Sequence, residues 1–182
     1  VGAQKSLVKL ANMQTTAVTL LVHNDRALWG HIGDTRLYYF HDGQLQQQTS
    51  DHSVPQMLVN AGEIEASQIR NHEDRNRLLR SLGSNDAIKP SLEKKATTIH
   101  PGDAFLLCTD GFWEYVSEEE MLECLNQADS AQDWLDIMEI RLLESVPEGN
   151  DNYSAISIII DKDSEERHEI NESILNKVLC KA

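Results

Sequence analysis

Three aspartates stand next to apolar segments, where a carboxylate could reach a bound ligand. Asp34 follows Trp-Gly-His-Ile-Gly, Asp110 follows Phe-Leu-Leu-Cys-Thr, and Asp151 precedes the apolar segment 153–160. Each has a glycine close by in the chain, which lets backbone segments approach closely. If the three segments converge, the carboxylates raise one another's pKa unless a cation neutralises them. Hard divalent cations such as Mg²⁺ or Mn²⁺ prefer all-oxygen ligands, and the lack of a His or Cys cluster disfavours zinc.

For Asp110 an ordinary Asp-Gly turn between an apolar strand and a helix is the alternative. That helix is predicted to begin after Ser117, because Glu120 stands three residues later, which is the spacing of a capping box. Asp42 and Asp103 also stand in turns, one in an Asp-Gly hairpin and one after Pro-Gly. Their turns explain both residues, so neither is a candidate ligand.

The elements that would position these carboxylates are strands first and helices later. Apolar and β-branched residues predict an antiparallel meander over 15–49, with strands at 16–23, 26–32, 36–41 and 44–49. Residues 54–80 are helical in pattern but polar. Further strands are expected at 97–99, 104–109 and 153–161, and helices at 117–126 and 131–145.

The chain is expected to form one domain over 1–161, followed by a C-terminal segment over 162–182. That segment begins with charged residues and ends in a predicted amphipathic helix, whose apolar face would comprise Ile170, Ile174, Leu175, Val178 and Leu179. The helix would dock on the domain or contact a further domain or partner. The opening residues 1–13 lack an initiator Met and look like the end of a helix, which indicates a fragment.

Composition restricts the class of partner. The 182 residues are 40% hydrophobic and 25% charged, as in soluble globular proteins. With 16 basic and 30 acidic residues, the net charge of -14 argues against nucleic acid and suits cations or basic peptides. Three cysteines without a CxxC pattern favour a reducing, cytoplasmic setting. No apolar run approaches the ~20 residues of a membrane span.

Five segments together carry a family resemblance. In chain order they are MQTTAVTLLV (13–22), WGHIGDTRLYYFHDGQLQQQTSDHS (29–53), RLLRSLG (77–83), PGDAFLLCTDGFWEYVSEEEM (101–121) and DNYSAISIII (151–160). Their order and spacing over about 150 residues resemble the bacterial branch of the type 2C, metal-dependent serine/threonine protein phosphatases.

The resemblance implies an α+β fold, an α-β-β-α sandwich of two antiparallel sheets flanked by helices. It also implies two or three Mn²⁺ or Mg²⁺ ions, with Asp110 and Asp151 at the central pair and Asp34 joining Asp110 at a looser third. The implied activity is hydrolysis of phosphoserine and phosphothreonine in proteins, such as kinase targets, by water that the metals activate. Residues 54–80 resemble the flap beside the cleft, and Asp51 and His52 would anchor its entrance. His52, like His31, is expected to be structural.

The chain departs from the family pattern at its start. The family's first strands carry an Arg that clamps phosphate and a DGxGGH segment that supplies a bridging Asp and a His acid. Neither Asp42-Gly43 nor Asp110-Gly111 is followed by Gly-Gly-His. We therefore expect the sandwich to lack these strands and the 182 residues to have little or no activity alone. Exposed sheet edges would favour a homo-oligomer.

Three alternatives remain open on the sequence. The chain could be a non-catalytic phosphatase-like module with a binding or regulatory role. It could be an acidic scaffold whose C-terminal helix recruits a partner. It could also be an unrelated calcium-binding domain, although the EF-hand loop pattern is absent. Substitution of Asp34, Asp110 or Asp151 would weaken metal binding only in a phosphatase-like site.

Overall fold

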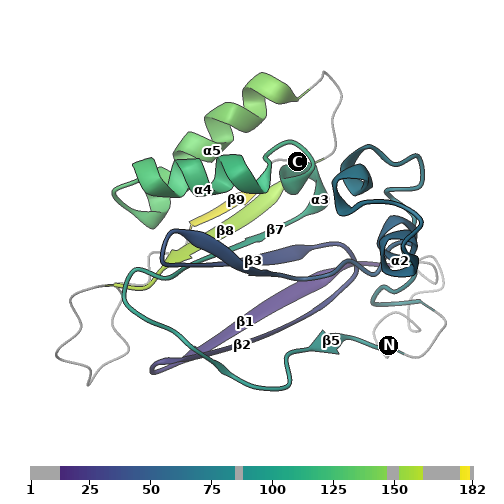
Figure 1. The fold of residues 1–182 in the computed structure, drawn as a ribbon, viewed down its shortest axis with the longest axis horizontal. Helices are drawn as coiled ribbons and strands as arrows, with labels where there is room; N and C mark the ends of the chain where they lie inside the picture. The colour runs from purple at the N-terminus through teal and green to yellow at the C-terminus, as the bar shows by residue number, and fades with distance from the viewer. Residues whose placement is uncertain (1–12, 85–87, 147–151, 162–176, 181–182) are drawn as a thin grey trace.

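Two antiparallel sheets and a group of helices make up the molecule, which is a mixed α+β fold (Figure 1). The computed structural model describes residues 13–84, 88–146, 152–161 and 177–180. The strands predicted within residues 16–49, 97–109 and 153–161 are confirmed, with ends that differ by a few residues. The helices predicted at 117–126 and 131–145 are confirmed as well.

The first sheet is built on a long hairpin. Strand β1 (Ala17–His23) pairs with β2 (Arg26–Ile32) along its whole length, from Ala17↔Ile32 to His23↔Arg26. Two short strands, β5 (Ser91–Leu92) and β6 (Thr97–Thr98), pair with the other edge of β2. Among the described strands, β1 pairs only with β2, so it forms an edge of this sheet.

The second sheet has the order β4-β3-β7-β8-β9. It contains β3 (Arg36–His41), β4 (Gln44–Gln48), β7 (Ala104–Cys108), β8 (Ser154–Ile159) and β9 (Lys177–Cys180). All residues of β7 are buried, because the strand lies in the middle of the sheet and is covered on both faces. This placement explains why its sequence is a continuous apolar run rather than an alternating one.

Side chains of β3 and β7 alternate between two hydrophobic cores. Leu37 and Tyr39 of β3 and Phe105 and Leu107 of β7 face the first sheet, where they pack with Trp29. Their neighbours in the same strands point to the opposite face, because successive side chains of a strand alternate. There they pack against helices α4 (Glu118–Gln127) and α5 (Ala131–Ser145), which lie over the second sheet in Figure 1.

Helix ends follow the local sequence. The capping box predicted at Ser117 and Glu120 is present: the Ser117 hydroxyl accepts from the Glu120 amide, and the Glu120 carboxylate accepts from the Ser117 amide. Residues 54–80 contain α2 (Val54–Ala61) and the 3-10 helix η2 (Ala66–Asn71). α2 ends at Gly62, whose φ of 74° favours glycine. These two helices lie together at one end of the sheets (Figure 1).

The C-terminal segment differs from its prediction. Residues 177–180 form strand β9, which pairs antiparallel with β8 from Ser154↔Cys180 to Ser157↔Lys177, so the helix predicted here is wrong for these four residues. Pairing gives the backbone groups at the edge of β8 hydrogen-bond partners, and this outweighs the weak preference of a helical pattern. The remainder of the predicted helix lies outside the described residues, and the boundary at residue 161 stays a prediction.

None of the described helices contains an apolar stretch of the length needed to span a bilayer.

Candidate metal centre

Asp34 lies in the tight turn that connects β2 to β3. Gly33 precedes it with a φ of 102°, and a side chain at Gly33 would clash with Thr16, so both the backbone angle and the space require glycine. His52 holds the turn: its amide donates to the Gly33 carbonyl at 2.8 Å, and its Nδ1 accepts from the Gly33 amide at 3.1 Å. The turn thus presents Asp34, which is 7% exposed, in a fixed place.

Cross-strand register brings Asp110 to the same end of the second sheet. Arg36, the first residue of β3, pairs with Cys108, the last residue of β7. Asp34 precedes Arg36 by two residues and Asp110 follows Cys108 by two, so the two aspartates lie next to paired strand termini at one end of the sheet. Asp110 begins the short helix α3 (Asp110–Trp113), and its Oδ1 accepts from the Gly111 amide at 2.9 Å. The turn predicted after β7 therefore continues directly into a helix.

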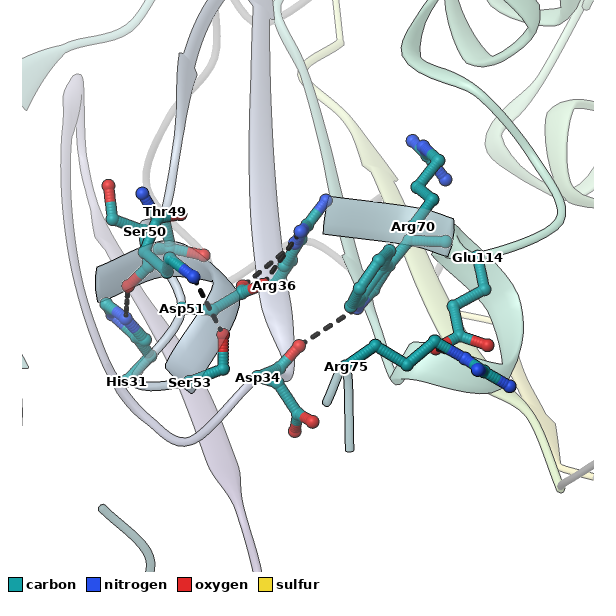
Figure 2. A network of polar contacts seen from close by, with 12 residues as sticks. His31, Asp34, Arg36, Thr49, Ser50, Asp51, Ser53, Arg70, Arg75 and Glu114 are labelled. Carbon is teal, nitrogen blue, oxygen red and sulfur yellow. Dashed lines mark hydrogen bonds and ion pairs between the residues drawn. The ribbon is translucent and has the colours of Figure 1, made fainter. Parts of the chain in front are cut away.

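A backbone contact joins these two segments. The indole Nε1 of Trp113 donates to the carbonyl oxygen of Asp34 at 2.9 Å. The Asp34 carboxylate points away from the Arg36–Asp51 pair in Figure 2. The helix α3 therefore fixes the backbone of Asp34, while the Asp34 carboxylate remains directed away from the Arg36–Asp51 pair.

The environment of Asp34 disfavours a negative charge. Burial, followed by the charge of Asp110, raises the pKa of Asp34 to about 7, and a hydrogen bond from its own backbone offsets this only partly. No ion pair with Asp34 is formed among the described residues. A buried carboxylate beside a second carboxylate has the donor chemistry for a hard divalent cation, which would restore the ionised form.

Asp151, the third predicted ligand, lies outside the described residues. The described strand β8 begins at the same end of the second sheet, because Ala155 pairs with Cys108. Within the described ranges, no group of three or more acidic, His or Cys side chains is arranged to hold a metal ion. The structure thus brings two of the three predicted carboxylates to one end of the second sheet and does not describe the third.

A buried ionic network lies beside this end of the sheet, and sequence reasoning missed most of it. Arg36 donates to both carboxylate oxygens of Asp51, from Nε at 2.9 Å and from Nη2 at 2.7 Å (Figure 2). Its Nη1 also donates to the Tyr38 hydroxyl at 3.1 Å and lies 3.6 Å from Glu118. The pairing of Asp51 with Arg36 agrees with the anchoring role expected for Asp51. Both oxygens of the Asp51 carboxylate accept hydrogen bonds from the Arg36 guanidinium.

The two histidines near the site have structural contacts. Their rings stack with centroids 4.6 Å apart, and His31 Nε2 bonds the Ser50 carbonyl at 2.8 Å. His52 Nε2 lies 2.9 Å from the Ser91 hydroxyl. Burial, then the neighbouring His31 and Arg80, lowers the pKa of His52 to about 4, so the ring stays neutral at physiological pH. These contacts agree with the structural role expected from the sequence.

A family model described as protein phosphatase 2C matches residues 2–144. The chain belongs to this family. The serine/threonine protein phosphatase PstP of Mycobacterium tuberculosis is 33% identical over 139 residues, which are 76% of this chain and 26% of the relative. A putative protein phosphatase 2C-type of Streptococcus pyogenes is 31% identical over 133 residues, which are 71% of this chain and 53% of the relative. This phosphatase 2C chain thus spans at most about half of either relative.

Solved structures agree with the family assignment. The structure of M. tuberculosis PstP superposes with a TM-score of 0.75 at 30% identity, covering 88% of this chain and 66% of the other. Stp1 of Staphylococcus aureus superposes with a TM-score of 0.77 at 26% identity, covering 88% and 61%. A structure of the PstP catalytic domain in complex with two manganese ions gives 0.70 at 28% identity, covering 88% and 65%. Metal dependence is therefore a property of the family to which this phosphatase 2C chain belongs.

Proposed function

We propose that this chain carries part of the metal site of a protein serine/threonine phosphatase that acts on phosphorylated proteins. The observation that supports it is the pairing of Arg36 with Cys108, which puts Asp34 and Asp110 at one end of the second sheet. Manganese in the PstP structure gives the cation a precedent within the family. The substrate class is carried over from the family, whose members are phosphatases of phosphoserine and phosphothreonine.

The donor set fits hard cations such as Mn²⁺ or Mg²⁺ in part. Asp110 and Asp151 would hold the central ions, and Asp34 would join Asp110 at a looser one. Bound there, such ions would acidify a water molecule and offset charge on the phosphoryl oxygens. The protein's own contribution is to fix the carboxylates: His52 and Trp113 hold the Asp34 turn, and β7 delivers Asp110.

For the 182 residues alone we propose little or no turnover. They contain no DGxGGH segment and no residue that stands in the family position of the phosphate-clamping Arg. The sandwich formed by these residues would accordingly lack the family's first strands. Helices on the outer face of the first sheet, which an α-β-β-α sandwich would have, remain a prediction. The alternative function is a non-catalytic binding or regulatory module. The two proposed functions share the candidate metal site and differ in whether the protein turns over a substrate.

Calorimetric titration of Mn²⁺ tests the metal site directly. We expect binding to the unsubstituted chain and an affinity at least about ten-fold lower in Asp110→Asn, because an amide oxygen replaces a charged ligand. Asp25→Asn is the matched control: it removes a carboxylate from an exposed turn and should leave the affinity unchanged. Equal binding by Asp110→Asn and the unsubstituted chain would contradict the site.

Phosphate release from a phosphothreonine peptide in the presence of Mn²⁺ tests the second part. Metal binding without release is expected for the 182 residues, whereas efficient release that Asp110→Asn abolishes would show that these residues suffice for catalysis.

A further inference from the structure

Trp113 connects the two segments that carry the candidate ligands. It is 2% exposed and stands three residues after Asp110 in the same short helix. Its indole N–H donates to the Asp34 carbonyl oxygen at 2.9 Å. A buried N–H that loses such a partner is costly, so the bond is a strong constraint. The position of the Asp34 backbone is thus set by the helix that begins at Asp110.

The ring of Trp113 is held in turn by two arginines. The Arg36 guanidinium carbon lies 3.5 Å from the ring centroid, and that of Arg70 lies 5.6 Å away. Both distances are within the range of cation–π attraction. Arg36 cannot easily move, because it is bound through two hydrogen bonds to Asp51. The indole is therefore packed against one fixed cation and one cation that belongs to the helix η2.

Glu118 joins these arginines to each other. Its carboxylate lies 2.6 Å from Arg70 and 3.6 Å from Arg36, and Arg70 also donates to the Val116 carbonyl at 3.3 Å. Burial opposes ionisation of Glu118, but Arg70 and then Arg36 hold its pKa below the usual value. The carboxylate is thus charged at neutral pH and connects η2 with the start of α4.

A second ion pair holds the same segment on the same surface. Arg75 Nε lies 3.1 Å from Glu114, the residue that follows Trp113 (Figure 2). The Arg70 segment, which we define as residues 66–75, is therefore attached at two points to residues 114–118. Both points are within a few residues of Trp113.

From these contacts we propose that Trp113 is a positioning residue that couples the Arg70 segment to the Asp34–Asp110 pair. Docking of the segment orients the indole, the indole fixes Asp34 relative to Asp110, and the spacing of the carboxylates sets the affinity for a divalent cation. The cation step rests on the proposed function. Since coupling between sites is reciprocal, a cation at the carboxylates would also stabilise the docked segment.

The tether itself can be tested without metal. Trp113→Phe keeps an aromatic ring beside the arginines and removes the N–H donor together with part of the ring volume, a change of size that the control below shares. Hydrogen exchange in the presence of a chelator should be roughly five-fold faster at amides 33–36 in this variant, as expected for the loss of one hydrogen bond. Trp134→Phe is the matched control, because the Trp134 indole donates to the Met121 carbonyl at the same 2.9 Å between α4 and α5. Unchanged exchange at 33–36 in Trp113→Phe overturns the tether.

The coupling is tested by Mn²⁺ affinity. We expect roughly five-fold weaker binding in Trp113→Phe, roughly three-fold weaker binding in Arg70→Gln, and no further loss in the double variant, because Arg70 acts through Trp113. Arg141→Gln breaks a comparable 2.8 Å pair with Glu123 on α4 and should have no effect. Additive losses, or an unchanged affinity in Arg70→Gln, overturn the coupling. Failure of the unsubstituted chain to bind Mn²⁺ overturns the proposed function instead, and hydrogen exchange alone then decides on the tether.

Discussion

Two aspartates buried at opposite ends of the second sheet have contrasting surroundings. Asp103, which is 2% exposed, accepts from the Tyr39 hydroxyl at 2.7 Å and from the His100 amide at 2.9 Å, and pairs with His41 Nδ1 at 2.6 Å. Asp34 is nearly as buried, but its pKa is raised to about 7 by burial and by Asp110. A buried carboxylate such as Asp103, which accepts hydrogen bonds from several protein donors, stabilises the fold. A buried carboxylate such as Asp34, which lies near another carboxylate, is suited to bind a cation.

The largest expected effect is the removal of the satisfied carboxylate. Asp103→Ala leaves the donors of Tyr39, His41 and His100 without their acceptor, and we expect a loss of about 3 kcal/mol in the free energy of unfolding. Urea unfolding at pH 7 measures it. Asp42→Asn is the control, because Asp42 lies 3.3 Å from His41 but its side chain is 87% exposed. A loss below about 1 kcal/mol in Asp103→Ala would remove the contrast between the two aspartates.

Substitution of Asp34 is expected to increase the free energy of unfolding, the opposite of the effect at Asp103. Its folded-state pKa of about 7 lies above the ~3.9 of an unfolded carboxyl, so its stabilising contribution is present below pH 4 and is lost as pH rises through 7. Asparagine does not titrate. In the presence of a chelator, Asp34→Asn should therefore gain about 2 kcal/mol relative to the unsubstituted chain between pH 5 and pH 8. Urea unfolding at both pH values measures the gain, and a difference that does not depend on pH would contradict the raised pKa.

Local patterns in the sequence suffice for most elements around these aspartates. Alternation predicts β1 to β4, the apolar run predicts β7, and the Ser-Glu spacing predicts the start of α4. Asp34 and Asp110 stand out because each directly follows a strand with a glycine beside it. These features can be predicted from the sequence because each depends on residues that are close together in the chain.

Contacts between distant residues could not be read in the same way. The surroundings of Trp113 combine Arg36, Arg70 and Glu118, which come from three separate segments. For Asp103, a turn explains its backbone but not the partners that reach it from β3. The strand β9 also depends on a distant partner, the edge of β8. In each case contacts between residues far apart in the chain decide the structure, and local sequence patterns do not show which residues make those contacts.

A smaller effect is expected at the histidine beside Asp34. The pKa of His52 is lowered to about 4, against ~6.5 in an unfolded chain, so the unfolded state binds a proton first as pH falls. Stability from this group is present above pH 6.5 and is lost as pH falls toward 4. Between pH 7 and 5.5 the unsubstituted chain should lose about 1 kcal/mol more than His52→Gln, as measured by urea unfolding. Parallel losses in the two proteins would mean that His52 titrates normally.

The histidine beside Asp103 should behave in the opposite way. The hydrogen bond to Asp103, and to a lesser degree the charge of Asp42, raises the pKa of His41 above its usual value despite some desolvation. Its stabilising contribution is thus present below pH 6.5 and is lost as pH rises through the raised value. An NMR titration of the ring protons should show a midpoint that falls clearly in Asp103→Asn and less in Asp42→Asn. If the order of the two variants were reversed, the exposed Asp42 rather than the buried Asp103 would govern His41, and the buried carboxylate would have a weaker hold on its partners than its distances indicate.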